Sequence, residues 1–321
     1  MKKILKWTGI ILLLLIVVLV ITISMRQNLK YDAPYPAGIH ATKDSSVLAR
    51  GKYLVYGPAH CADCHGGPGT EALVNKGDEV DLAGGKVFEI PIGKIHPANI
   101  TPDEETGIGK ISDEQIARSL RYGVGFDGRV LIDFMPFHNT SDEDLAAIIS
   151  YLRSMKPVKN KVPANTSTIL GKIVRAFLLK PTGPTGEVLK TVKQDSSVEY
   201  GKYLANSVAN CRGCHTDRDL KTGEFIGKDF AGGFKMESFA DEKYFFLTPN
   251  ITPDKTTGHI VNWNEEVFLQ RFRKGKVYPQ SPMPWGPFGR MSDMEVRAIY
   301  RYLQTVPAVE NKVAPIVEMV K

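Results

Sequence analysis

The feature that most constrains the fold is an internal repeat that covers most of the 321-residue chain. Short segments of one copy return in the same order in the other, at offsets of 148 to 151 residues. The paired segments begin at Gly51 and Gly201, Leu82 and Phe230, Asn99 and Asn250, Met135 and Met283, and Ile148 and Ile299. Matches in a common order and spacing indicate a duplicated unit, so we predict two domains of the same fold.

Each copy contains the pattern Cys-x-x-Cys-His, and the two patterns hold all four cysteines of the chain. Two thiols on one short turn can form thioethers to the vinyl groups of a porphyrin. The histidine that follows can then ligate the iron, and this arrangement is the attachment signature of c-type haem. We therefore predict two covalently attached haem c groups, bound through Cys61, Cys64, Cys211 and Cys214.

Two other chemistries use paired cysteines. A redox dithiol of the thioredoxin kind belongs beside a βαβ pattern, which this sequence lacks. A structural zinc site pairs its Cys-x-x-Cys units within a few tens of residues, whereas the two units here are 150 residues apart. Neither alternative explains why a histidine follows both patterns.

The iron of each haem needs two axial ligands. His65 and His215 follow the cysteines directly and are the predicted proximal ligands. Met135 and Met283 occupy matching positions, each followed by a proline and an aromatic residue, and are the predicted distal ligands. A thioether is a soft ligand that stabilises ferrous iron relative to a second histidine and raises the potential.

Other side chains compete for the distal position. His96 and His138 lie in the first copy and have no counterpart at the aligned positions of the second. Met291 and Met294 flank the start of the last predicted helix and are alternative ligands in the second copy. A lone methionine most often fills a gap in the core.

The N-terminus carries a long apolar segment. Lysines at positions 2, 3 and 6 precede an apolar run from Trp7 to Met25, which is long enough to cross the roughly 30 Å hydrocarbon core of a bilayer as a helix. A cleaved signal peptide has a shorter apolar region that ends in small residues of the Ala-x-Ala kind. This run ends in Thr-Ile-Ser-Met-Arg (residues 22–26), which is a poor cleavage site. We predict an uncleaved single-pass anchor with a cytoplasmic N-terminus and the remaining chain outside.

Between and around the repeats the sequence is rich in loops. The capping patterns at Ser112, Ser141, Asn264 and Ser292 predict helices, as does the segment from Ser45 to Tyr56, which Asp44 or Ser45 would cap. No alternating strand pattern is evident. We predict an all-α fold of two tandem domains with long loops, preceded by one transmembrane helix, and with their haem motifs the two domains resemble tandem class I cytochrome c domains. The predicted segments are an anchor (1–28), a spacer (29–44), domain 1 (45–158), a linker (159–194), domain 2 (195–310) and a tail (311–321).

The predicted linker contains an amphipathic stretch from Leu170 to Leu179. This stretch either packs as a strap against both domains or contacts a membrane surface or a partner. The formal net charge of +6 shrinks once haem propionates are counted, so we predict no nucleic-acid partner.

The order Ala-Gly-Gly, Asn-Ile-Thr-Pro-Asp, Thr-Gly and Met-Pro resembles the cytochrome c subunits of bacterial membrane-bound alcohol, gluconate and related dehydrogenases. The resemblance runs from Ser45 to Pro307, although those subunits often carry three haem domains. It implies outer-sphere electron transfer on the periplasmic side of the inner membrane, from a dehydrogenase to a terminal oxidase, a cytochrome or quinone. The chain would then be an electron carrier and not a catalyst.

The alternative function is a di-haem cytochrome c peroxidase that reduces hydrogen peroxide. Such an enzyme must leave one iron open or openable, and its two domains carry different distal ligands. The same Met-Pro loop occurs in both copies of this chain, which argues against that alternative.

Overall fold

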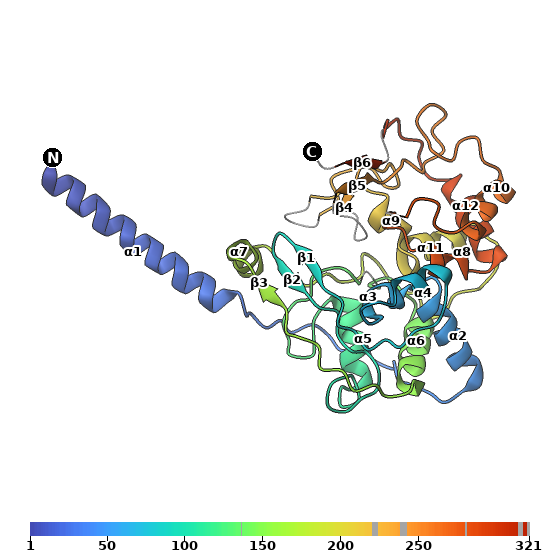
Figure 1. Ribbon diagram of the computed structural model, residues 1–321, viewed down its shortest axis with the longest axis horizontal. Helices are drawn as coiled ribbons and strands as arrows, with labels where there is room; N and C mark the ends of the chain where they lie inside the picture. Colours follow the sequence, from blue (N-terminus) through green and yellow to red (C-terminus); the bar gives the residue numbers. More distant parts are fainter. Residues whose placement is uncertain (136, 220–223, 238–242, 280, 314–316, 320–321) are drawn as a thin grey trace.

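The computed structural model describes all residues except 136, 220–223, 238–242, 280, 314–316 and 320–321. Figure 1 shows one long helix that projects from a body of short helices and loops. The helices are α1 (Lys2–Arg26), α2 (Ser45–Tyr56), α3 (Cys61–His65), α4 (Glu71–Lys76), α5 (Asp113–Tyr122), α6 (Asp142–Ser154), α7 (Ile169–Phe177), α8 (Val198–Tyr203), α9 (Cys211–Cys214), α10 (Glu265–Arg273), α11 (Trp285–Gly289) and α12 (Asp293–Leu303), with a π-helical segment at Leu204–Val208.

The long helix α1 has a mean hydropathy of 3.0 over an 18-residue window, and none of its residues is buried. Its 25 residues extend about 37 Å at about 1.5 Å per residue, which exceeds the roughly 30 Å of a hydrocarbon core. Helix α1 is therefore long and apolar enough to cross a membrane. An apolar helix this close to the N-terminus also fits a signal sequence.

In the first half of the body (residues 45–162), helices α2 and α6 pack closely. A Cβ added to Gly51 of α2 would lie 1.9 Å from the backbone oxygen of Ala147 in α6. Glycine therefore permits a closer approach of the two backbones than any other residue would. Asp44 caps α2 by accepting hydrogen bonds from the amides of Ser46 and Val47.

The second half (residues 195–313) repeats this packing with α8 and α12. A Cβ on Gly201 would lie 1.9 Å from the backbone oxygen of Ala298. The helix begun by α8 continues as the π-helical segment, whereas α2 is α-helical throughout. The predicted caps are confirmed, because Ser112, Ser141, Asn264 and Ser292 each accept a hydrogen bond from the amide three residues later.

The prediction of a mostly helical fold is confirmed, but the described residues also form two small antiparallel sheets, so the expectation of purely α domains was wrong. One sheet has the order β1–β2–β3 (Phe88–Ile90, Gly93–Ile95 and Thr166–Ser167), and the other β4–β5–β6 (Lys235–Glu237, Tyr244–Leu247 and Val317–Met319). Each strand has two to four residues. Segments this short are too brief to show the period of two by which a strand is recognised.

The segments predicted as spacer, linker and tail contact the body. In the spacer, Ile39 is only 1% exposed, and the amide of Ala41 donates to Asp113 Oδ2 over 2.8 Å. In the linker, β3 pairs with β2, and α7 lies beside α1 (Figure 1). In the tail, β6 pairs with β5.

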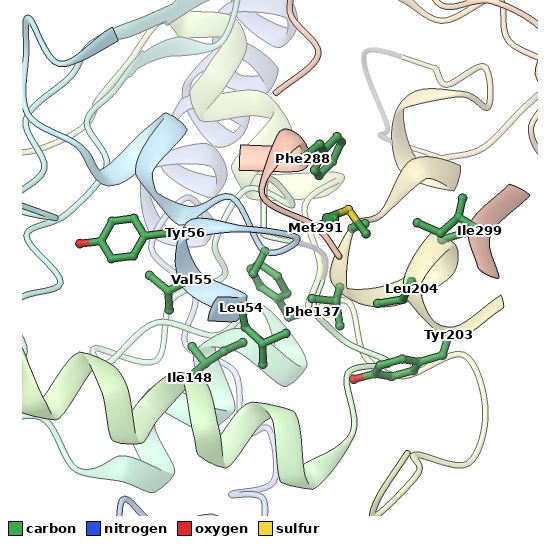
Figure 2. Packing of buried hydrophobic residues seen from close by; sticks show 14 of the residues in the cluster. Leu54, Val55, Tyr56, Phe137, Ile148, Tyr203, Leu204, Phe288, Met291 and Ile299 are labelled. Carbon is green, nitrogen blue, oxygen red and sulfur yellow. The ribbon is translucent and has the colours of Figure 1, made fainter. Parts of the chain in front are cut away.

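The two halves share one apolar core. Figure 2 shows Leu54 and Phe137 of the first half on one side of this core, facing Leu204, Met291 and Ile299 of the second half. Helix α4 also meets α11 across the boundary. A Cβ on Gly286 of α11 would lie 2.0 Å from the backbone oxygen of Val74 in α4.

The halves also exchange hydrogen bonds from repeat-equivalent tyrosines. Tyr53 of the first half donates to Glu295 Oε2 of the second, and its hydroxyl accepts from the amide of Ser292 over 2.8 Å. Tyr203 of the second half donates to Asp144 Oδ2 over 2.8 Å and accepts from the amide of Ser141 over 3.1 Å. Each tyrosine therefore contacts the first turn of the last helix in the opposite half.

Candidate haem sites

The two cysteine pairs lie on the short helices α3 and α9, so both thiols of a pair share one turn. The residue before each helix has a left-handed backbone, with φ of 38° at His60 and 46° at Asn210. Such a conformation is uncommon for residues other than glycine. Its recurrence at the same position of both halves indicates that the two motifs enter their helices by the same backbone path.

The cysteine thiols do not have the properties of a redox dithiol. Burial raises the pKa of Cys61 to about 12, that of Cys64 to about 11 and that of Cys211 to about 12. Catalytic dithiols have a lowered pKa because the thiolate is the reactive form. Within the described residues, no group of three or more His, Cys, Asp or Glu side chains has an arrangement that could hold a metal ion.

The two motif histidines are held by main-chain carbonyls. The Nδ1 atom of His65 lies 2.8 Å from the backbone oxygen of Ala98, and Nδ1 of His215 lies 3.0 Å from that of Pro249. A carbonyl oxygen only accepts, so Nδ1 carries the proton and donates it, and the lone pair of Nε2 is available to a metal. Burial lowers the pKa of both imidazoles, against the opposing effect of these hydrogen bonds, and thereby favours the neutral form that binds metal.

The Ala-Gly-Gly motif holds the main chain of each motif histidine and of the residue just before its partner carbonyl. In the first half the amide of Gly84 donates to the backbone oxygen of His65 over 2.7 Å, and the amide of Gly85 donates to that of Pro97 over 3.1 Å. Gly84 has a φ of 70°, and a Cβ there would lie 2.4 Å from the oxygen of Pro97. Only glycine combines this backbone conformation with this close approach.

The second half has the same arrangement. The amide of Gly232 donates to the backbone oxygen of His215 over 2.8 Å, and the amide of Gly233 donates to that of Thr248 over 2.8 Å. Gly232 has a φ of 71°, and a Cβ there would lie 2.3 Å from the oxygen of Thr248. Each histidine is therefore fixed at its main-chain oxygen as well as at Nδ1.

The Asn-Ile-Thr-Pro-Asp turn begins directly after the carbonyl that holds each histidine. Asn99 Oδ1 accepts from the amide of Thr101 over 3.0 Å, and Asn99 Nδ2 donates to the oxygen of Val158 over 2.7 Å. Asn250 repeats both bonds, with the amide of Thr252 over 3.0 Å and the oxygen of Val309 over 2.8 Å. The turn therefore ties each histidine's partner carbonyl to the chain beyond the last helix of that half.

Two asparagines that sequence reasoning missed complete this framework. Asn160 Nδ2 donates to the oxygen of Ala83 over 2.9 Å, and Asn311 Nδ2 donates to that of Ala231 over 2.9 Å. Both begin an Asn-Lys-Val sequence that occurs once after each copy's last helix. The signal was thus present, a few residues past the last matched proline and just outside the predicted domain boundaries.

The two predicted methionine ligands occupy matching turns. Met135 and Met283 are half-buried and border the core. In each turn the amide two residues later, that of Phe137 or Trp285, donates to the methionine oxygen over 2.8 Å. Both aromatic rings are buried and fix the end of the turn. Pro136 lies outside the described residues.

The competing residues have other environments. Met291 is 1% exposed and lies in the core shared by the two halves (Figure 2). Both ring nitrogens of His138 are engaged, Nδ1 with the oxygen of Arg121 and Nε2 with Asp133 Oδ1, each at 2.9 Å. His96 Nδ1 is buried without a hydrogen-bond partner. Met294 lies half-buried in the first turn of α12.

Together, these features define a class of helical protein in which each half carries a Cys-x-x-Cys-His helix, a carbonyl-held histidine and a methionine turn. Residues 48–156 match the family model for cytochrome c. The resemblance to cytochrome c subunits that the motifs predicted is confirmed.

Three relatives illustrate this similarity. One subunit of the nicotinate dehydrogenase of Pseudomonas putida is 28% identical over 84% of this chain and 22% of its own length. The cytochrome c subunit of the alcohol dehydrogenase (quinone) of Gluconobacter oxydans is 29% identical over 83% of this chain and 56% of its own length. A dihaem cytochrome of Cereibacter sphaeroides is 26% identical over 78% and 83%. The chain thus spans about a fifth of the length of the nicotinate dehydrogenase subunit and about half of the length of the alcohol dehydrogenase subunit.

Proposed function

We propose that the chain is a membrane-anchored di-haem c-type cytochrome that carries electrons. Two tandem cytochrome c domains, residues 45–158 and 195–310, would each hold one haem. The first haem would be attached to Cys61 and Cys64 with His65 and Met135 as axial ligands. The second would be attached to Cys211 and Cys214 with His215 and Met283 as axial ligands.

The observation that carries this proposal is the duplicated support of the two histidines. A metal-ligating histidine usually donates its other ring N–H to an oxygen that sets its tautomer and orientation. His65 and His215 both do so, at matching positions and with the same glycine pair behind them. Because both halves share this feature, the support extends to the second half, which lies outside the matched family segment.

A bound haem would supply one-electron exchange between ferric and ferrous iron. The chain's own residues would attach, orient and bury it. The carbonyls of Ala98 and Pro249 keep Nε2 of each histidine directed away from the main chain and unprotonated. With a methionine on the opposite side, both axial positions would be filled. Electrons would then pass by outer-sphere transfer, with no substrate bound at the metal.

The relatives suggest the partners. Their names include dehydrogenases and the cytochrome c subunit of a quinone-dependent enzyme, so we propose a dehydrogenase as the electron donor. The acceptor would be a terminal oxidase, another cytochrome or quinone. Helix α1 would anchor the chain in the inner membrane with the body on the periplasmic side, where bacterial c-type haem is attached.

The peroxidase alternative is not supported. The relatives described above are dehydrogenase subunits and a dihaem cytochrome. The two methionine turns also have the same hydrogen bond and the same buried aromatic position.

The test is haem content by intact mass and absorption after expression with the c-type haem maturation system. The wild-type chain is expected to carry two haems, and the paired substitutions Cys61→Ala and Cys64→Ala are expected to remove one. His60→Ala is the matched control. His60 adjoins the motif, but its Nδ1 is engaged in a hydrogen bond with the backbone oxygen of Pro58. A chain with one haem, or steady turnover of hydrogen peroxide by the purified protein, would contradict the proposal.

A further inference from the structure

Helix α7 carries an exposed apolar face that the proposed electron transfer does not use. Ile169 is 80% exposed, Leu170 49% and Phe177 41%, and Ile173 and Leu178 are also exposed. Residues 169, 173 and 177 are four apart and lie on one side of the helix. A run of apolar side chains on one helix face marks a contact surface, unlike single exposed apolar residues, which are normal.

The opposite face of α7 is firmly held by the first half. A Cβ on Gly171 would lie 1.9 Å from the backbone oxygen of Ile92, so helix and loop are in direct contact. Thr168 caps α7 through the amide of Gly171, and its hydroxyl donates to the oxygen of Pro91 over 2.9 Å. Because these contacts occupy that face, the exposed face cannot turn inward without breaking them.

Helix α7 lies beside the C-terminal end of α1. Arg26, the last residue of α1, donates from Nε to the oxygen of Ala176 over 3.0 Å, and its guanidinium lies 5.6 Å from the ring centroid of Phe177. Tyr31 donates to the oxygen of Leu179 over 3.2 Å. Figure 1 shows α7 nearly end-on while α1 lies along the page, so the two axes cross. If α1 spans the bilayer, α7 therefore lies across the membrane normal at the depth where α1 ends.

The charges along the α7 segment itself are those expected at the surface of a bilayer. From Thr168 to Lys180 the sequence has no acidic residue, and it has the basic residues Lys172, Arg175 and Lys180. Lys172 and Lys180 are exposed. Helices that lie in the membrane interface combine an apolar face with basic residues that attract anionic lipid headgroups.

We propose that α7 is a second membrane contact, lying in the interface with its apolar face in the boundary between headgroups and acyl chains. The proposal rests on α1 being a membrane anchor. The occupant of the surface is the lipid bilayer, because the face continues the apolar surface of α1 at its interfacial end. Two contacts, one spanning and one lying flat, would fix the orientation of the haem-bearing body above the membrane.

The experiment uses the full haem-bearing chain in vesicles of phosphatidylcholine and phosphatidylglycerol. The vesicles contain a trace of phospholipid with a photoactivatable diazirine in its acyl chain. After irradiation, mass spectrometry of peptides locates the lipid adducts. We expect adducts in α1 and at residues 169–178, and none at Ile226, which is 65% exposed in the second half.

A double variant and a matched control test the face itself. Ile173→Glu with Phe177→Glu is expected to lose the adducts at residues 169–178 and keep those in α1, with an unchanged haem spectrum. Should that variant fold poorly, Ile173→Ser with Phe177→Ser makes the same test. Ile226→Glu, an equally polar change at an exposed apolar residue elsewhere, is expected to leave the pattern unchanged.

Three results would overturn the proposal. Adducts in α1 without adducts at residues 169–178 would show that α7 faces water, a second copy or a protein partner while the anchor stands. Adducts of equal yield at Ile226 and α7 would show no preferred contact. The absence of adducts in α1 would remove the anchor, and α7 with it, whereas the haem content measured above would still decide electron carriage.

Discussion

At the scale of single residues, each candidate haem site depends on a hydrogen bond between a side chain and the main chain. His65 and His215 donate to carbonyls, not to carboxylates, so no buried negative charge is needed to orient them. A carboxylate partner would raise the basicity of the imidazole more strongly than a neutral carbonyl does. The neutral partner fits an electron carrier whose ligand stays neutral when the metal changes charge.

The first prediction separates Met283, which we propose as a metal ligand, from Met291, which packs in the core. Met283→Ala is expected to remove the weak sulfur-to-iron absorption band of one haem and to lower its potential, because a thioether favours ferrous iron. Met291→Ala is expected to keep the spectrum and to reduce the free energy of unfolding by about 2–5 kcal/mol, as other large-to-small core changes do. Absorption spectra, redox titration and denaturant unfolding measure these effects.

The contrast between Met283 and Met291 supplies its own control, since both methionines precede the last helix of the second half, on either side of α11. If Met291→Ala removed the band and Met283→Ala did not, the ligand assignment would be reversed. Met135→Ala in the first half is expected to behave as Met283→Ala does.

The second prediction concerns the aspartate that closes each Asn-Ile-Thr-Pro-Asp turn. Hydrogen bonds from the side chain and amide of Thr257 lower the pKa of Asp254 from 3.8 to about 2. The ionised carboxylate therefore adds stability that is fully present above pH 3.8 and is lost as the pH falls through about 2. Asp254→Asn is expected to be less stable than wild type at neutral pH, and the difference is expected to vanish below about pH 2.

Unfolding by denaturant at a series of pH values measures this difference. Asp103 occupies the matching turn, where the side chain and amide of Thr106 lower its pKa, so Asp103→Asn is expected to show the same trend. A difference between Asp254→Asn and wild type that stayed constant from pH 7 to pH 2 would refute the electrostatic explanation.

At the scale of elements, the fold is organised by two helix crossings with glycine at the contact. The third prediction is that Gly51→Ala reduces the free energy of unfolding by about 1–3 kcal/mol or more, because its Cβ would lie 1.9 Å from the oxygen of Ala147. Gly201→Ala is expected to do the same in the second half. Gly186→Ala is the matched control, because no atom lies within 4 Å of the added Cβ there.

Denaturant unfolding of the haem-bearing variants measures the loss. If Gly51→Ala were as stable as Gly186→Ala, the backbones of α2 and α6 would not be in the close contact described. Both substitutions reduce the entropy of the unfolded chain equally, so the difference between them isolates the steric effect of the crossing.

The predictability of the elements follows from the range of the interactions that form them. Caps such as Ser112 and Asn264 act within four residues, and the haem motifs act within five, so their patterns can be recognised locally. The strands could not be predicted, because β3 is a two-residue strand that exists only by pairing with β2 across about seventy residues. The carbonyls of Ala98 and Pro249 were also missed, since any residue supplies a carbonyl.

At the scale of the whole molecule, the halves are joined by a nearly symmetric exchange. Tyr53 and Tyr203 are 150 residues apart, as the repeat requires, and each donates to a carboxylate of the other half, Glu295 or Asp144. Burial raises the pKa of both tyrosines, so both hydroxyls stay protonated and can donate. The sequence repeat could not predict this exchange, because the repeat aligns equivalent residues of the two copies and does not show which residues of different copies are in contact.

One residue breaks the symmetry. Arg50 donates to Asp144 from Nε over 2.8 Å and from Nη2 over 3.0 Å, and its Nη1 lies 3.5 Å from Glu295 Oε1. The repeat-equivalent residue is Tyr200, which donates to Glu295 Oε1 over 2.8 Å. Burial disfavours the guanidinium cation of Arg50. The hydrogen bond and charge of Asp144 and the charge of Glu295 outweigh this and raise its pKa above the ordinary value. A single cation therefore serves two carboxylates that are each 1% exposed.

The fourth prediction tests this shared cation. Arg50→Met keeps much of the side-chain volume but leaves two buried carboxylates without their cation, which is expected to cost about 3–5 kcal/mol of the free energy of unfolding. Arg129→Met is the control, because Arg129 pairs with Asp127 at an exposed position and its loss is expected to cost about 0–1 kcal/mol. If charge is the cause, adding Asp144→Asn and Glu295→Gln to Arg50→Met restores most of the lost stability. If the triple variant is no more stable than Arg50→Met alone, the shared apolar core holds the halves together, and the ionic contacts add no net stability.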